Sequence, residues 1–182
     1  MTRSYSLIIL LLFAGCSNEP NKASSSETSK SNKKMSATYL KIIPTSPSFV
    51  PDKATQSHAL CILNAIYDGK DIEMLTTDTI EFVDQGANFD SVNCNLCGKT
   101  VEISDWQDAM DKAYTKQFVD LTIVMPCCHK KNSLNDLKYN SSAGFAKFVI
   151  SISDPEHQIE ESDLKKLQQV LGTPLRVIWA HY

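Results

Sequence analysis

Residues 94–98 read Cys-Asn-Leu-Cys-Gly, and residues 126–129 read Pro-Cys-Cys-His. The first stretch predicts a knuckle, a tight turn that brings its two sulfurs together and that Gly98 allows to close. The second stretch follows an apolar run typical of a strand. Two close pairs of soft ligands predict a single tetrahedral metal site, for which zinc is the default metal. The predicted ligands are Cys94, Cys97, Cys127 and Cys128.

The adjacent second pair leaves the fourth ligand and the chemistry of the site open. Neighbouring side chains on extended backbone diverge, so His129 is an alternative to Cys128. Two disulfides compete with zinc in an exported chain, although a Cys-x-x-Cys disulfide and a vicinal disulfide are both strained. A redox-active or soft-metal-handling set of thiols is a further alternative. A zinc hydrolase would need an open coordination position and a nearby base. Asp90 and Asp136 are close only in sequence, so we name no catalytic residue.

A polar stretch follows the second cysteine pair and contains Asn132, Asn135, Asp136 and Tyr139. Amide and carboxylate groups beside a metal site commonly hold its loops and ligands in place by hydrogen bonds. We therefore expect Asn135 and Asp136 to support the metal site. The alternative function for this stretch is that of a recognition loop.

Strand and helix patterns alternate on both sides of the cysteines. Pro51 in a first helical turn and apolar residues at helical spacing indicate a helix from about 51 to 67. Ser104 and Gln107 match a capping box ahead of a second helix, and Gly172 ends a third. The segment 175–182 is apolar on both faces, which predicts a central strand. The other predicted strands are 39–43, 79–83, 118–125 and 145–152.

The order of these elements is strand, helix, strand, then the cysteine-bearing middle, then strand, helix, strand. This order predicts the α+β class, as a ferredoxin-like sandwich of two β-α-β units that flank a zinc-ribbon-like insert. We expect one α+β domain at residues 37–182, which is an ordinary domain size, with the metal-binding insert at about 84–140.

The N-terminus carries a targeting pattern. Arg3 precedes the apolar run Leu7–Phe13, which is far shorter than the roughly 20 residues that span a bilayer. Residues 13–16 read Phe-Ala-Gly-Cys and resemble the lipobox of bacterial lipoproteins, although that motif usually begins with Leu. The resemblance implies that residues 1–15 are a signal peptide and that Cys16 is lipidated, which would anchor the chain without a membrane-spanning helix. An ordinary signal peptide and a buried N-terminal strand are the alternatives.

Residues 16–36 combine the lipidation site with a stretch rich in Ser, Lys and Asn that has no aromatic or branched aliphatic residue. Such a composition predicts a flexible tether between a membrane and a folded domain. We therefore expect a lipid-anchored protein of the cell envelope. Ser17 after the lipidated cysteine implies, by the same resemblance, the outer membrane if the organism has one.

Charge and motifs exclude several classes of function. The net charge is −3, and the domain has no basic stripe with interleaved aromatic residues, so nucleic acid is not an expected partner. The sequence contains no P-loop, no glycine-rich dinucleotide turn, no Gly-x-Ser-x-Gly elbow and no His-Glu-x-x-His motif.

Five stretches of the domain carry a resemblance to known sequences: Phe82–Cys97, Pro126–Cys128, Ser133–Tyr139, Gly144–Ala146 and Arg176–His181. Together they resemble a family of uncharacterised bacterial proteins. The resemblance implies that the Cys-x-x-Cys-Gly and Cys-Cys pairs belong to one zinc-ribbon-like module, and it implies no activity. Two positions depart from the family pattern: Asn95 replaces a proline or small residue, and His129 replaces a glycine. Most members lack a lipoprotein signal.

These features together predict a membrane-anchored lipoprotein whose structural zinc stiffens an insert that presents a surface to a protein partner. The alternative is an envelope protein that carries out thiol redox chemistry or handles soft metals. A zinc hydrolase is the third hypothesis.

Overall fold

The computed structural model describes residues 36–182. The predicted signal peptide, the predicted lipidation site Cys16 and the tether up to residue 35 lie outside the described residues. The described part is mixed α+β, which confirms the predicted class, and it has three α-helices and three antiparallel sheets. None of its helices is long and apolar enough to cross a membrane.

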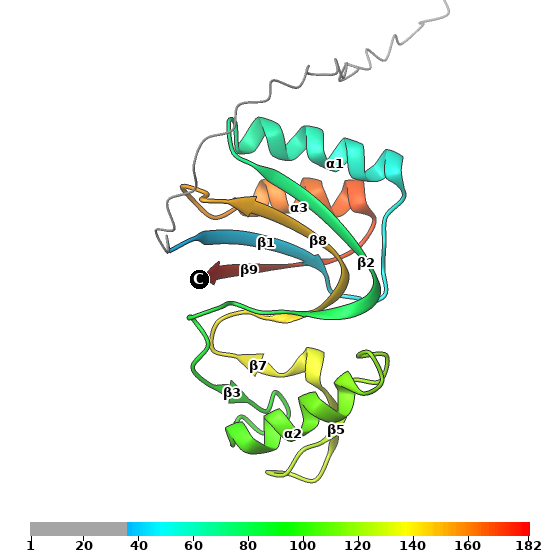
Figure 1. Ribbon diagram of the computed structural model, residues 1–182, viewed down its shortest axis with the longest axis vertical. Helices are drawn as coiled ribbons and strands as arrows, with labels where there is room; N and C mark the ends of the chain where they lie inside the picture. The colour runs from blue at the N-terminus through cyan, green and yellow to red at the C-terminus, as the bar shows by residue number, and fades with distance from the viewer. Residues whose placement is uncertain (1–35) are drawn as a thin grey trace, which may run out of the picture. The chain divides into compact units, whose positions relative to one another are not determined.

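A four-stranded antiparallel sheet and two helices form one part of the fold, which we call the frame (Figure 1). The strand order in this sheet is β2-β8-β1-β9. The elements of the frame are β1 (Thr38–Pro44), α1 (Lys53–Ile66), β2 (Ile72–Val83), β8 (Gly144–Ser153), α3 (Glu161–Leu171) and β9 (Leu175–His181).

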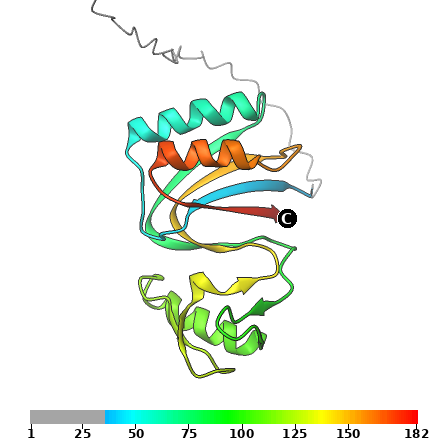
Figure 2. The ribbon, with the colours of Figure 1, turned by 180° about the vertical axis from the view of Figure 1, so that it is seen from behind.

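Helices α1 and α3 lie side by side on one face of this sheet (Figure 2). The carboxylate of Asp52 accepts the N–H of Thr55 at 2.7 Å and so caps α1, and Gly172 ends α3 with a left-handed φ of 69°. The core between helices and sheet is aliphatic and aromatic, and each fully buried side chain of this kind contributes roughly 1.5–3 kcal/mol. Its main members are Leu40, Ile42, Ala59, Leu63, Phe148, Ile150, Ile152, Leu167 and Leu171.

Strand β2 bends where its pairing with β8 shifts register, between Thr76 and Glu81. Ile42 and Val177 face the helices. Because side chains alternate along a strand, the next residues, Ile43 and Ile178, face the opposite side of the sheet. A second, smaller core lies on that side. Its members are Ile43, Val83, Ala146 and Ile178.

The chain after β2 covers the outer edge of β9. Gly86 forms a parallel bridge with His181, and the N–H of Ala87 donates to the carbonyl of His181 at 2.8 Å. Gly86 has a φ of 61°, and a Cβ there would clash with the His181 carbonyl oxygen, so the close approach requires glycine. The prediction that β9 is a central strand is therefore wrong. It is an edge strand of the four-stranded sheet, and this crossing segment shields part of its edge.

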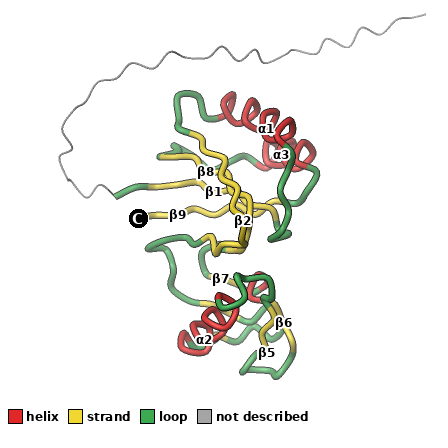
Figure 3. Tube along the Cα trace, turned by 45° about the vertical axis from the view of Figure 1, so that its right-hand side comes forward, coloured by secondary structure: helices red, strands yellow, loops and turns green. Residues whose placement is uncertain are grey.

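Residues 84–140 lie between the ends of β2 and β8, and we refer to them as the insert. Its strands are short and make two small sheets, of order β4-β3-β7 and β5-β6, and α2 lies beside β5 (Figure 3). The elements are β3 (Val92–Asn93), β4 (Thr100–Val101), α2 (Ile103–Tyr114), β5 (Thr122–Val124), β6 (Lys131–Ser133), the 3-10 helix η1 (Leu134–Asp136) and β7 (Lys138–Tyr139).

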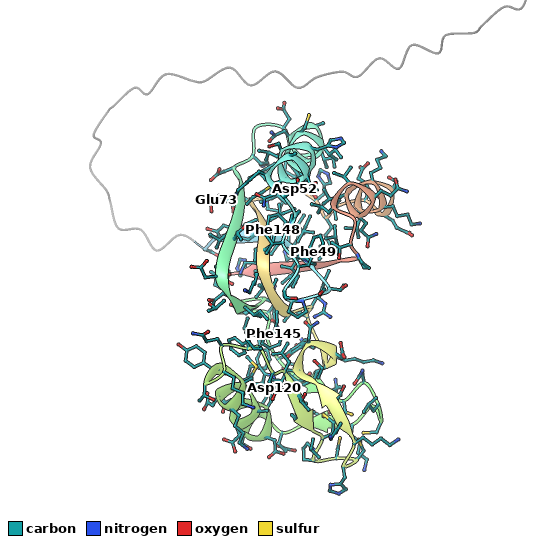
Figure 4. All side chains as sticks on the ribbon, turned by 90° about the vertical axis from the view of Figure 1, so that its right-hand side faces the viewer. Phe49, Asp52, Glu73, Asp120, Phe145 and Phe148 are labelled. Atoms are coloured by element: carbon teal, nitrogen blue, oxygen red, sulfur yellow. The ribbon has the colours of Figure 1, made fainter. Side chains whose placement is uncertain are left out.

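The insert and the frame share side chains along β8. Phe145 belongs to the core of the insert, with Val92, Val101 and Met125, whereas Phe148 belongs to the core beneath the helices. Figure 4 marks Phe145 where the sheet meets the insert and Phe148 farther along the same strand. The long strand β8 therefore ties the two parts together.

Two local predictions in the insert are wrong. The strand expected at 118–125 is only Thr122–Val124, because Gln117 and Phe118 have φ values of 52° and 55°, which are incompatible with a strand. The capping box at Ser104 is not formed. Helix α2 begins after Glu102 without a side-chain cap, so Ser104 lies within its first turn.

Candidate metal centre

Two hairpins of the insert carry the four cysteines at their tips. Strands β3 and β4 flank the loop of residues 94–99, and β5 and β6 flank the loop of residues 125–130. In the first loop the N–H of Gly98 donates to the carbonyl of Cys94 at 2.8 Å, and the N–H of Cys94 donates to the carbonyl of Lys99 at 2.8 Å. These two bonds join the first residue of the loop to its last two residues and so close the loop.

The second loop has the same conformation as the first. The N–H of His129 donates to the carbonyl of Met125 at 2.8 Å, and the N–H of Met125 donates to the carbonyl of Lys130 at 2.9 Å. The fifth residue of each loop is left-handed, with a φ of 75° at Gly98 and 56° at His129. His129 therefore occupies the position where a knuckle commonly has glycine, and the two loops are conformational copies.

The equivalence of the loops shows that the second cysteine pair is offset. Met125 stands where the first loop has Cys94, and both residues are fully buried. Cys128 stands where the first loop has Cys97, and Cys127 occupies the place of Leu96. One ligand of the second loop is thus displaced by two residues relative to the first, a feature that the cysteine spacing alone does not show.

The four thiols converge on one point in space. All four Sγ atoms lie within 4.8 Å of one another, with 3.9 Å between Cys94 and Cys128 and 3.3 Å between Cys97 and Cys127. Ligands of a tetrahedral ion with metal–sulfur bonds of about 2.3 Å lie roughly 3.8 Å apart. The four thiols can therefore hold one metal ion.

His129 is not part of this cluster, since its side chain is exposed and the group of possible ligands found within residues 36–182 consists of the four cysteines. All four are free cysteines in the structure. The predicted thiol set is therefore brought together, and the alternative ligand is left outside it.

The electrostatics of the cluster favour a bound cation. Burial raises the pKa of the Cys94 thiol, but the backbone N–H groups of Leu96 and Cys97 oppose this and lower that pKa to about 7. Burial and hydrogen bonds to the neighbouring thiols raise the pKa of Cys127 to about 12. Four thiolates cannot form so close together without a positive charge among them, and a metal ion supplies that charge.

The two hairpins are joined beside the thiols by a pair of amides. The side chain of Asn132 on β6 donates to the Oδ1 of Asn95 in the first loop at 2.6 Å. The polar stretch after the cysteines therefore supports the site through Asn132. Asn95 supplies the acceptor.

Asn135 has a different role from the one its position in the sequence suggests. Its Oδ1 accepts the N–H of Phe145 at 3.2 Å and the Nη1 of Arg176 at 3.1 Å, and its Nδ2 donates to the carbonyl of Thr45 at 3.1 Å. These partners belong to the frame, so Asn135 is a latch between the insert and the frame. No described hydrogen bond joins it to a cysteine.

Arg176 is the residue of this latch that sequence reasoning missed. Its guanidinium also donates to the carbonyls of Ala143 at 2.6 Å and Asn135 at 2.9 Å. Burial lowers the pKa of Arg176, and the nearby charge of Asp136 raises it. Asp136 itself is exposed, and no described hydrogen bond joins it to a cysteine. An arginine within an otherwise apolar strand was the available signal.

Aromatic side chains form the floor of the insert. The indole Nε1 of Trp106 on α2 donates to the Tyr139 hydroxyl at 3.4 Å, and that hydroxyl donates to the carbonyl of Leu134 at 2.9 Å. The rings of Phe89 and Trp106 stack with their centroids 5.0 Å apart. This packing holds α2 against the strands that lead to the cysteine loops.

Comparison of the chain with protein-family models, with curated proteins and with solved structures gives no match in any of the three.

Proposed function

We propose that this protein is a lipid-anchored envelope protein whose insert is stabilised by one structural zinc ion and acts as a binding module for another protein. The observation that carries the proposal is the convergence of four thiols from two equivalent hairpin loops within 4.8 Å. The short strands of the insert have little pairing of their own, so a metal that joins the two hairpins would supply much of their stability.

A structural role fits this ligand set better than a catalytic one. Four thiolates fill a tetrahedral coordination sphere, whereas a catalytic zinc keeps a position for water or substrate. The polar side chains that join the hairpins, Asn95 and Asn132, are amides and cannot act as bases. We therefore propose no hydrolytic activity.

Exposed apolar side chains of the insert are available for contact with a partner. Of the eight large hydrophobic residues that are exposed within residues 36–182, five lie in the insert. The five are Leu96, Ile103, Tyr114, Val119 and Val124.

The remaining parts of the proposal rest on resemblance and on strand order. The lipobox-like residues 13–16 support lipidation of Cys16 and attachment to the outer membrane if the organism has one. The frame order β2-β8-β1-β9, with both helices on one face, supports a ferredoxin-like classification. The similarity to uncharacterised bacterial proteins supports treating both cysteine pairs as one zinc-ribbon-like module.

Metal analysis of the full-length chain in detergent tests the zinc site. We expect one zinc per wild-type chain, loss of most of this zinc in Cys94→Ser and Cys128→Ser, and full occupancy in the matched control His129→Ala. A wild-type chain that is folded but binds no metal would overturn the proposal. For the anchor, Cys16→Ser should abolish incorporation of labelled palmitate and release the chain from membranes.

A second candidate function is thiol redox chemistry or soft-metal handling, which the Cys97–Cys127 pair favours. Cys97 is exposed, Cys127 is half-buried, and their Sγ atoms are only 3.3 Å apart. This side of the cluster is accessible to an oxidant or to an incoming Cu(I) ion. A zinc-loaded chain that keeps all four thiols in the presence of a disulfide oxidant and does not exchange zinc for Cu(I) would exclude this candidate.

A further inference from the structure

A groove runs between helix α2 and strand β5 on the insert, with a volume of about 570 Å³. One wall is the row Asp105, Asp108, Ala109 and Lys112 of α2, and the other is β5. Figure 3 shows the helix and the strand side by side. Seven residues connect the end of α2 to the start of β5.

The groove opens on the edge of β5 rather than on one of its faces. The consecutive residues Thr122, Ile123 and Val124 all line it. Successive side chains of a strand point to opposite faces, so three in a row can line one hollow only at the strand's edge. Strand β5 has β6 on one side only, which leaves this edge without a neighbouring strand in its sheet.

Hydrogen-bonding groups of the backbone point into the groove from this edge. The N–H of Leu134 donates to the carbonyl of Leu121 at 2.8 Å, which makes these two residues a hydrogen-bonded pair of the hairpin. Because hydrogen-bonded pairs alternate along an antiparallel ladder, the next such pair is Ile123 and Asn132. The backbone N–H and C=O groups of Thr122 and Val124 therefore point away from β6. The Thr122 N–H bonds to Asp120 at 3.1 Å. Within residues 36–182 the N–H and C=O of Val124 and the C=O of Thr122 receive no such partner.

The side chains around the edge suit an apolar anchor. Val124 is 59% exposed at the rim, while Ile123 is buried in the core of the insert. Ala109 on the opposite wall is small, which leaves room for a large side chain of an incoming segment. A strand added to β5 would point alternate side chains at this wall and to solvent.

The charged side chains that line the groove are three aspartates and two lysines, which give it a net charge of −1. Asp105, Asp108 and Lys112 line its helical wall, and none of the three takes part in an ion pair within the described part of the chain. Lys116 is already neutralised by Asp120 at 2.9 Å. A lysine or arginine on the incoming segment would complement the two free carboxylates and fix its direction in the groove.

From these observations we propose that the groove binds an extended segment of a partner protein as an additional strand beside β5, with a large apolar side chain against Ala109 and a basic side chain against Asp105 and Asp108. This inference rests on the proposed function, because it names the surface through which the metal-stabilised insert binds its partner. The main-chain bonds supply affinity, and the two side-chain contacts supply selectivity.

The test uses zinc-loaded full-length chain in detergent and fluorescence anisotropy. The probes are labelled hexapeptides of sequence Thr-Φ-Lys-Φ-Thr-Lys, where Φ is Val, Leu or Phe, each paired with a form that is N-methylated at alternate backbone amides. We expect saturable binding that N-methylation weakens by about tenfold or more, since it removes the bonds to the strand edge.

The double variant D105N/D108N should weaken binding by about tenfold and reduce its salt dependence, because the charge contacts are lost. The matched control is Asp111→Asn, since Asp111 is exposed on the same helix but does not line the groove. It should stay within about twofold of the wild type. Absence of binding by every hexapeptide, or equal binding by the N-methylated forms or by D105N/D108N, would overturn the groove proposal.

Zinc content is measured on every sample, which separates the two proposals. A chain with one zinc that binds no hexapeptide overturns the groove and leaves the structural zinc site standing. A folded chain without zinc overturns the proposed function, whatever its peptide binding.

Discussion

The latch between insert and frame can be broken by Asn135→Ala. This change deletes three side-chain hydrogen bonds, to the backbone of Phe145 and Thr45 and to Arg176. At about 0.5–1.5 kcal/mol each, their loss removes roughly 1.5–4.5 kcal/mol, and the fully buried Phe145 N–H is left without its acceptor. We expect the free energy of unfolding to fall by roughly 3–4 kcal/mol, which is a large share of the stability of a domain of this size.

The two tryptophans of the chain allow this effect to be located. Trp106 lies in α2 of the insert and Trp179 in β9 of the frame. In single-tryptophan variants, urea unfolding followed by fluorescence should show coincident transitions in the wild-type background. With Asn135→Ala, we expect the Trp106 transition to move to lower urea than the Trp179 transition, because the insert loses its attachment.

The matched control is Lys138→Ala, which changes an exposed nearby residue whose side chain makes no described hydrogen bond or ion pair, and which should cost less than about 0.5 kcal/mol. A loss below about 1 kcal/mol for Asn135→Ala, or a shift of both transitions by equal amounts, would refute the role of Asn135 as a latch.

Three further predictions follow from single features of the fold. The Cys127→Ser variant should lose zinc and regain it when Met125→Cys is added, because residue 125 occupies in the second loop the position that the ligand Cys94 occupies in the first. Metal analysis that finds no recovery of zinc would disprove the equivalence of the two loops. Gly86→Ala should lower the free energy of unfolding by at least about 2 kcal/mol in thermal unfolding, since the left-handed backbone and a clash with the His181 carbonyl both oppose a side chain there. Gly69→Ala, which has a positive φ but open space around it, should cost only about 1 kcal/mol. Equal losses in the two variants would show that the clash at residue 86 is relieved. The Thr55 N–H lowers the pKa of Asp52, so the contribution of this carboxylate to stability is complete above its unfolded pKa of about 4 and is lost as the pH falls through its folded pKa. The difference in urea midpoint between the wild type and Asp52→Ala should therefore shrink on acidification. A difference that stays constant with pH would contradict the capping role of Asp52.

The cysteine loops show how far local sequence determines structure. Residues 94–98 predicted a tight loop correctly, because the spacing of two cysteines and a glycine that accepts a left-handed φ act within one turn. The same reasoning left Cys128 and His129 as competing ligands. Only the folded hairpins decided between them, since the left-handed backbone at His129 leaves its side chain exposed, outside the thiol cluster.

The roles of Asn135 and β9 depended on contacts between residues far apart in the chain. Asn135 follows the cysteines in sequence, but its partners Thr45 and Arg176 come from the two ends of the domain. Strand β9 is apolar on both faces because the helices cover one face and a second, smaller core that includes Ile178 lies on the other, and not because strands flank it on both sides.

The α+β class and the set of four thiols that can hold a metal could be predicted from the amino-acid sequence alone. These properties follow from periodicity, spacing and side-chain chemistry, which act over a few residues. The tertiary structure decided that the two cysteine loops are copies with one ligand displaced, that Asn135 latches the insert to the frame, and that the free edge of β5 faces a groove with unpaired carboxylates. Those properties arise from the packing of distant segments, and no local pattern along the chain specifies which segments will meet.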